Sequence, residues 1–161
     1  MKPIRLVVVD DHALFRSGLI SLLNGTPEFQ VVGEAGNGQE ALDVVRRLSP
    51  DVILLDVNMP VMGGVETVTE LRQGSDARIL MLTISKNDED LFGAISAGAD
   101  GYLLKNVTPD ELFKAIRNVQ SGLSVLAPDV TRQVLRAVSL EQVGAADRGL
   151  SSRELEVLKC L

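Results

Sequence analysis

Short runs of consecutive apolar residues alternate along the chain with longer stretches in which apolar residues recur at helical spacing. The apolar runs predict buried strands at Ile4–Val9, Gln30–Ala35, Val52–Leu55, Ile79–Leu82 and Gly101–Leu104. The periodic stretches predict helices at Ala13–Leu23, Gln39–Leu48, Val65–Leu71, Asp88–Ala97 and Thr108–Gln120. Because strands and helices alternate strictly, the pattern predicts an α/β fold with a doubly wound, five-stranded parallel sheet covered by helices on both faces.

The alternation stops near residue 122, and this change divides the chain. The last of the five helices has the clearest boundary signals, with Thr108 as N-cap, Pro109 at the first helical position and Gly122 after its end. Residues 1–122 are therefore predicted to form one domain. Residues 123–149 read as a partly helical linker, with a helix expected at Ala127–Leu140, and residues 150–161 begin a further helical element.

Composition supports a packed domain and excludes several classes of protein. The 161 residues are 45% hydrophobic, and their formal net charge is −6. Residues 1–123 contain 17 acidic and 11 basic side chains, so the acidic surplus lies there. Binding to nucleic acid without sequence preference needs clustered basic side chains, and this region lacks that excess. Aromatic residues make up only 3%, which argues against a stacking platform for bases or a flavin.

The chain carries no targeting signal that we can identify. Cys160 is the only cysteine, so the chain cannot form an internal disulfide. This is consistent with a protein of a reducing compartment. No apolar run approaches the roughly 20 residues of a membrane span. We therefore expect a cytoplasmic protein with no membrane partner.

Polar residues follow the ends of the predicted strands. Asp10 and Asp11 follow the first strand, Asp56 the third, Thr83 the fourth and Lys105 the fifth. Ligands of open parallel sheets bind outside the carboxyl ends of the strands, so these side chains are expected to converge. One aspartate at a strand end is more often a helix cap, but the whole set at equivalent ends favours a site.

The chemistry of this set points to a divalent cation and a phosphoryl group. Carboxylates that lie close together repel one another, and Mg²⁺ (or Mn²⁺) relieves the repulsion while bridging to phosphate. Asn58 offers a backbone carbonyl as a further ligand. Lys105 would supply a positive charge to the phosphoryl group and Thr83 a hydrogen bond. The pattern therefore predicts phosphoryl transfer to a carboxylate nucleophile.

Three other residues have simpler interpretations from sequence alone. Tyr102 reads as an aromatic residue at the edge of the core, and Phe15 as a core residue. His12, the only histidine, reads as a surface residue at the start of a helix rather than as a base or ligand.

The motifs resemble the receiver domain of two-component response regulators. The matching segments cover residues 4–121 in order, namely Val7-Val8-Val9-Asp10-Asp11, Asp56-Val57-Asn58-Met59-Pro60 with Gly63-Gly64, Thr83, and Gly101-Tyr102-Leu103-Leu104-Lys105. The resemblance implies the CheY-like, flavodoxin-like strand order 2-1-3-4-5.

The resemblance also assigns roles to these residues. Asp56 matches the phosphoacceptor, and Asp11, Asp56 and the Asn58 carbonyl match the metal ligands, with Asp10 as a supporting acid. Lys105 matches the lysine that pairs with the phosphoryl group.

The remaining matches concern the conformational switch. Thr83 and Tyr102 match the switch pair, in which a hydroxyl follows the phosphoryl group and an aromatic ring turns inward. One position departs from many receivers, because Asn106 stands where they have proline. A cis peptide bond after Lys105 would cost about 3 kcal/mol without proline.

The resemblance extends beyond the receiver to the NarL/FixJ branch. Asp11-His12 with Phe15-Arg16-Ser17-Gly18-Leu19 looks like that branch, and the segment from Leu150 to Leu158 is similar to the opening of a LuxR-type helix-turn-helix domain. Such domains read DNA with a later helix. No recognition helix is expected within these 161 residues, so none of them is assigned to DNA binding.

These expectations describe a response regulator, with two alternative functions. A sensor histidine kinase would phosphorylate Asp56, the receiver would dimerise, and a C-terminal domain would bind DNA and control transcription. Alternatively, the receiver acts on a protein target without DNA. A third reading is an aspartyl-phosphate enzyme, but Asn58 stands where such enzymes commonly place an acid/base aspartate and cannot do general acid–base work. We therefore expect no enzymatic activity beyond slow self-phosphorylation and dephosphorylation.

Overall fold

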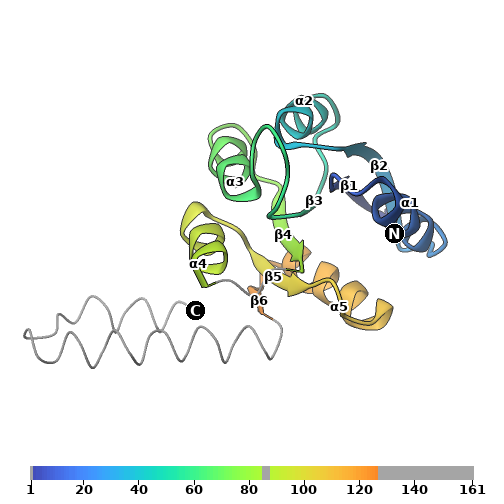
Figure 1. The fold of residues 1–161 in the computed structure, drawn as a ribbon. Coiled ribbons are helices and arrows are strands. Elements are labelled where there is room, and N and C mark those ends of the chain that lie inside the picture. The colour runs from blue at the N-terminus through green and yellow to red at the C-terminus, as the bar shows by residue number, and fades with distance from the viewer. Residues whose placement is uncertain (1, 85–87, 127–161) are drawn as a thin grey trace, which may run out of the picture.

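A parallel sheet with helices on both faces forms the described part of the chain (Figure 1), which in the computed structural model comprises residues 2–84 and 88–126. The strands are β1 (Ile4–Val9), β2 (Phe29–Ala35), β3 (Val52–Leu55), β4 (Arg78–Thr83), β5 (Gly101–Leu104) and β6 (Val125–Leu126). The helices are α1 (Ala13–Asn24), α2 (Gly38–Leu48), α3 (Gly64–Arg72), α4 (Asp88–Ala97) and α5 (Pro109–Gln120). The strand order is β2-β1-β3-β4-β5-β6.

The predicted fold class is confirmed, with one addition. The first five strands are parallel and follow the order 2-1-3-4-5. The sheet also has a two-residue sixth strand, β6, which pairs with β5 and lies within the segment expected to be a linker. Thr83 is the last residue of β4 rather than the residue after it. The helix expected at Ala127–Leu140, and the segment 150–161, lie outside the described residues.

The sheet is buried on both faces, which explains its continuous apolar strands. Figure 1 shows α1 and α5 on one face and α2, α3 and α4 on the other. Side chains alternate accordingly along β1, where Leu6 and Val8 pack with α1 and α5, while Val7 and Val9 pack with α2, α3 and α4. Within the described residues, no helix combines the length and apolar character needed to cross a membrane.

Backbone hydrogen bonds continue the ladder just beyond the strands and position the polar residues there. The Asp10 N–H donates to the Ala35 carbonyl at 3.0 Å, and the Asp56 N–H donates to the Val9 carbonyl at 3.0 Å. The Lys105 N–H donates to the Thr83 carbonyl at 2.8 Å. These three residues are therefore held by the sheet itself, which places functional side chains more precisely than a loop can.

The N-terminus of α5 follows shortly after Lys105 and is capped as predicted. Pro109 is the first helical residue, and the Thr108 hydroxyl accepts a hydrogen bond from the Glu111 N–H at 3.2 Å. This bond satisfies one of the N–H groups that a helix leaves unpaired at its start.

The loop from β3 to α3 approaches the end of β3 closely at one point and is strained at another. A Cβ at Gly64 would lie 2.5 Å from the Asp56 carbonyl oxygen, so only glycine lets α3 begin there. Val61 has φ of 70°, in the left-handed region, although its side chain is β-branched. It is 81% exposed, so burial of the side chain does not offset the strain.

Replacing Val61 with Asn is expected to stabilise the protein by about 0.5–1 kcal/mol, because asparagine tolerates positive φ without the entropic cost of glycine. Urea unfolding of the two proteins would measure the difference. Val61→Ala keeps a Cβ and serves as the control, with a smaller gain expected. A loss of stability in Val61→Asn would show that the valine side chain makes a contact that outweighs the backbone strain.

Candidate functional site

Two buried carboxylates share one ammonium group at the carboxyl ends of β1, β3 and β5. Asp10 and Asp56 are each 3% exposed. The Lys105 Nζ lies 2.7 Å from Asp10 Oδ2 and 3.3 Å from Asp56 Oδ2. One positive charge thus faces two negative charges in a place with little solvent, so the trio keeps a net negative charge when both acids are ionised. The sequence-based expectation that these strand ends converge is confirmed for all three residues.

The Asp56 carboxyl is poorly stabilised as an anion in this arrangement. Burial raises its pKa above the ordinary value of 3.8, and the negative charge of Asp10 raises it further. The Lys105 ammonium and a weak hydrogen bond from the Asn58 N–H, 3.5 Å from Asp56 Oδ1, lower the pKa but do not cancel the rise. A further cation beside Asp56 would therefore be favourable.

This raised pKa predicts how stability depends on pH when divalent cations are removed. Folded Asp56 holds its proton more tightly than the unfolded chain does, so stability falls as pH rises through the folded-state pKa. Asp56→Asn removes this cost and is expected to be more stable than the parent at pH 7, by about 1 kcal/mol. The advantage should shrink on acidification toward pH 4.

Urea unfolding in chelator across this pH range checks the expectation, with the exposed Asp43→Asn as the matched control. Parallel stability curves for Asp56→Asn and the parent would contradict it.

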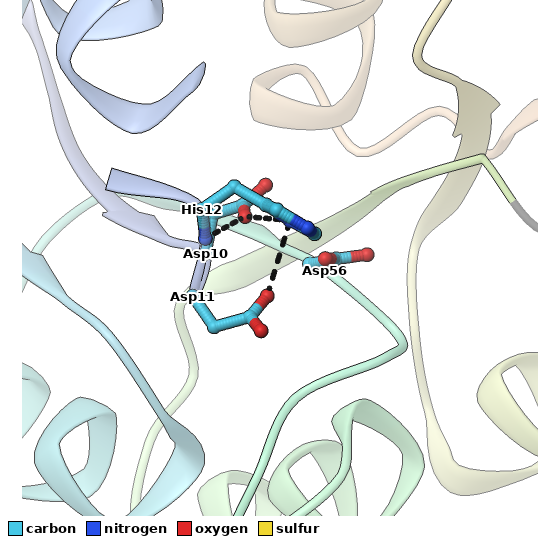
Figure 2. A group of neighbouring side chains, drawn as sticks. All are labelled: Asp10, Asp11, His12 and Asp56. Atoms are coloured by element: carbon cyan, nitrogen blue, oxygen red, sulfur yellow. Dashed lines mark hydrogen bonds and ion pairs between the residues drawn. The ribbon is translucent and has the colours of Figure 1, made fainter. Parts of the chain in front are cut away.

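Asp11 and His12 complete the site on its solvent side. One ligand atom from each of Asp10, Asp11, His12 and Asp56 lies within 4.8 Å of the others. Figure 2 shows the first three side chains projecting from the segment after β1, with Asp56 facing them from the end of β3. Three carboxylates at this spacing fit a hard divalent cation such as Mg²⁺, which prefers oxygen ligands. The Asn58 carbonyl as a ligand stays a prediction.

Thr83 is the last residue of β4, and Tyr102 is the second residue of the neighbouring strand β5. Both are buried, and Tyr102 packs into the core on the face covered by α2, α3 and α4. Burial raises the pKa of the Tyr102 phenol, and the charges of Asp90 and Asp56 raise it further. Tyr102 is therefore a neutral, inward-facing ring within electrostatic reach of Asp56. The Lys105–Asn106 peptide bond is trans.

Two residues of α1 contribute contacts that the sequence alone did not reveal. The Lys105 Nζ lies 4.4 Å from the centre of the Phe15 ring, a cation–π distance. Arg16 donates from Nη1 to the Asp10 carbonyl and from Nε to Glu34 Oε1 at 2.9 Å. The sequence predicts Phe15 as a core residue and Arg16 only as part of a motif, because spacing along a helix does not tell which neighbouring segment a side chain contacts.

Comparison with known proteins shows which family the chain resembles. The protein-family model of the response regulator receiver domain matches residues 6–117 of the chain. The nitrate/nitrite response regulator NarL of Escherichia coli K12 is 38% identical over 164 aligned positions, covering 99% of this chain and 76% of NarL. NarP of the same organism is 45% identical over 160 positions, covering 97% of this chain and 73% of NarP.

Solved structures agree with the sequence relatives. A LuxR-family response regulator from Aurantimonas sp. SI85-9A1 superposes with a TM-score of 0.80 at 33% identity, covering 84% of this chain and 98% of that one. The receiver domain of a putative NarL from Mycobacterium tuberculosis gives a TM-score of 0.73 at 36% identity, covering 76% of this chain and 99% of that one. The chain belongs to the response regulator family and carries its receiver domain, with NarL-like relatives.

Proposed function

We propose that this protein accepts a phosphoryl group on Asp56 from the phosphohistidine of a sensor kinase. The observation that carries this proposal is the buried Asp10–Lys105–Asp56 group, with Asp11 at its opening. A buried carboxylate beside an ammonium and other acids has the parts that phosphoryl transfer to an aspartate needs. The family supports the proposal, since its members are regulatory receivers rather than catalysts.

The transfer would use Asp56 as the nucleophile. An Asp56 carboxylate oxygen forms a bond to phosphorus while the bond from phosphorus to the donor's imidazole nitrogen breaks, and the bonding electrons stay on the imidazole. A divalent cation held by Asp11, Asp56 and the Asn58 carbonyl, with Asp10 in support, would neutralise charge on the phosphoryl oxygens. Lys105 holds a positive charge at the same oxygens. A small acyl phosphate could replace the kinase as donor.

The product would act as a conformational signal. An acyl phosphate on Asp56 carries up to about two negative charges in place of the carboxylate's one, and it adds this charge to a site that already has excess negative charge. Thr83 would follow the phosphoryl group by donating a hydrogen bond, Lys105 would shift toward it, and Tyr102 would stay turned inward. The surface of α4, β5 and α5 would then change its affinity for a partner.

The response of the whole protein would be transcriptional. We propose that phosphorylation favours a homodimer in the cytoplasm, and that the dimer brings a helix-turn-helix domain beginning at residue 150 onto paired DNA half-sites. The NarL and NarP relatives, which are response regulators by name, support this reading. Turnover of the phosphoryl group would be limited to slow self-phosphorylation and dephosphorylation.

Light scattering tests the link between the site and assembly. Beryllofluoride with Mg²⁺ mimics the phosphoryl group and is expected to shift the protein from monomer toward dimer. Asp43→Asn should respond in the same way, and Asp56→Asn should not. An unchanged mass in the parent protein would contradict the proposed dimerisation.

A further inference from the structure

His12 reaches the metal site from its exposed side. Its Nδ1 lies 3.3 Å from Asp10 Oδ1 and 3.3 Å from Asp11 Oδ1. Figure 2 shows the imidazole ring pointing from the segment after β1 toward Asp56. The backbone N–H of His12 donates a hydrogen bond to Asp10 Oδ1 at 2.8 Å. This bond holds the His12 backbone beside the site. The prediction that His12 is a surface residue agrees with its side chain, which is 63% exposed. The sequence did not reveal the contacts of its imidazole with Asp10 and Asp11.

The spacing of these atoms suits one six-coordinate cation. With metal–ligand bonds of about 2.1 Å, neighbouring ligands of an octahedron lie about 3.0 Å apart and opposite ones about 4.2 Å apart. The imidazole nitrogen is 3.3 Å from each of two carboxylate oxygens, close to the separation of neighbouring ligands. The four ligand atoms lie within 4.8 Å of one another, a looser limit than the octahedron's, so a bound cation would draw them slightly closer together. His12 can therefore occupy a position that would otherwise hold water.

Lys105 contacts other oxygens than those that lie beside His12. Its ammonium contacts the Oδ2 atoms of Asp10 and Asp56, at 2.7 and 3.3 Å. The Oδ1 atom of Asp10 is the one that faces His12. Lys105 and His12 thus contact different oxygens of Asp10, so the ammonium does not take the position beside His12.

The chemistry of imidazole then distinguishes between cations. Mg²⁺ takes oxygen ligands and gives up its waters reluctantly. Mn²⁺ also favours oxygen ligands, but as a first-row transition metal it accepts an imidazole nitrogen in place of a water more readily than Mg²⁺ does. We propose that His12 is a direct ligand of the divalent cation in this site and makes the site select Mn²⁺ over Mg²⁺. This inference rests on the proposed function insofar as it assumes that a divalent cation binds beside Asp56.

Electron spin echo spectroscopy of the Mn²⁺ form tests the ligand directly. Since His12 is the only histidine in the chain, imidazole ¹⁴N modulation in tag-free protein identifies it without ambiguity. We expect this modulation in the parent protein and its absence in His12→Gln. Calorimetry should show that His12→Gln weakens Mn²⁺ binding by about 10-fold while changing Mg²⁺ binding little.

Asp11→Asn is the matched control, because it removes a charged oxygen ligand and should weaken both cations. Bound Mn²⁺ without imidazole modulation in the parent would overturn the role of His12 and leave the proposed function intact. Equal losses of Mn²⁺ and Mg²⁺ affinity in His12→Gln would overturn the selectivity. If neither cation binds the parent, both this inference and the metal dependence of the proposed function fail.

Discussion

Replacing Asp56 with Asn is expected to abolish phosphoryl labelling of the protein by a small-molecule donor in the presence of Mg²⁺. The amide keeps the size of the side chain at the end of β3 but has no anionic oxygen to attack phosphorus. Intact-mass spectrometry after incubation with acetyl phosphate would measure the effect, since each phosphoryl group adds a defined mass. The expected result is complete loss rather than a reduced rate.

The control for this variant is Asp10→Asn, which removes the neighbouring buried carboxylate and keeps the Asp56 nucleophile. It should lower the extent of labelling without abolishing it, because Asp10 supports the cation and does not accept the phosphoryl group. Full labelling of Asp56→Asn would move the nucleophile to another acid of the site.

Replacing Lys105 with Ala is expected to destabilise the protein by about 3 kcal/mol when divalent cations are removed, because two buried carboxylates then lose their shared counter-charge. The two ion pairs at 2.7 and 3.3 Å carry this expectation. Urea unfolding in chelator would measure it. Addition of Mg²⁺ should recover part of the loss, since a bound cation replaces some of the missing charge.

Two further variants separate charge from packing. Lys105→Met keeps an aliphatic stem beside Phe15 and should lose most of the same stability, whereas the exposed Lys114→Ala should lose little. A Lys105→Ala protein as stable as Lys114→Ala would show that the two carboxylates do not need this ammonium.

Much of the fold could be predicted because buried parallel strands leave a clear pattern. The bounds of β1, β3 and β5 match the apolar runs, since those strands are covered on both faces. The strand order came from the resemblance, because apolar runs do not say which strands are neighbours. The short β6 has two residues and no periodicity, so its pairing with β5 depends on tertiary contacts that the pattern does not show.

The part of the site that lies at the carboxyl ends of the strands could be predicted from the sequence. Asp10, Asp56 and Lys105 follow directly from parallel strands and meet as expected. His12 and Phe15 could not be placed in this way, because the directions of side chains near a helix start depend on the local backbone and not on a repeating pattern. The positive φ of Val61 could not be predicted either, because valine rarely adopts a left-handed backbone conformation.

We propose that Asp56, beside Lys105 and a divalent cation, is the residue that accepts the phosphoryl group. Borohydride reduction converts an aspartyl phosphate to homoserine, which peptide mass spectrometry can locate. After phosphorylation of the unmodified chain with Mg²⁺, we expect homoserine at position 56 alone, and none when a chelator replaces Mg²⁺. Homoserine at position 10 or 11, or equal conversion in chelator, would contradict it.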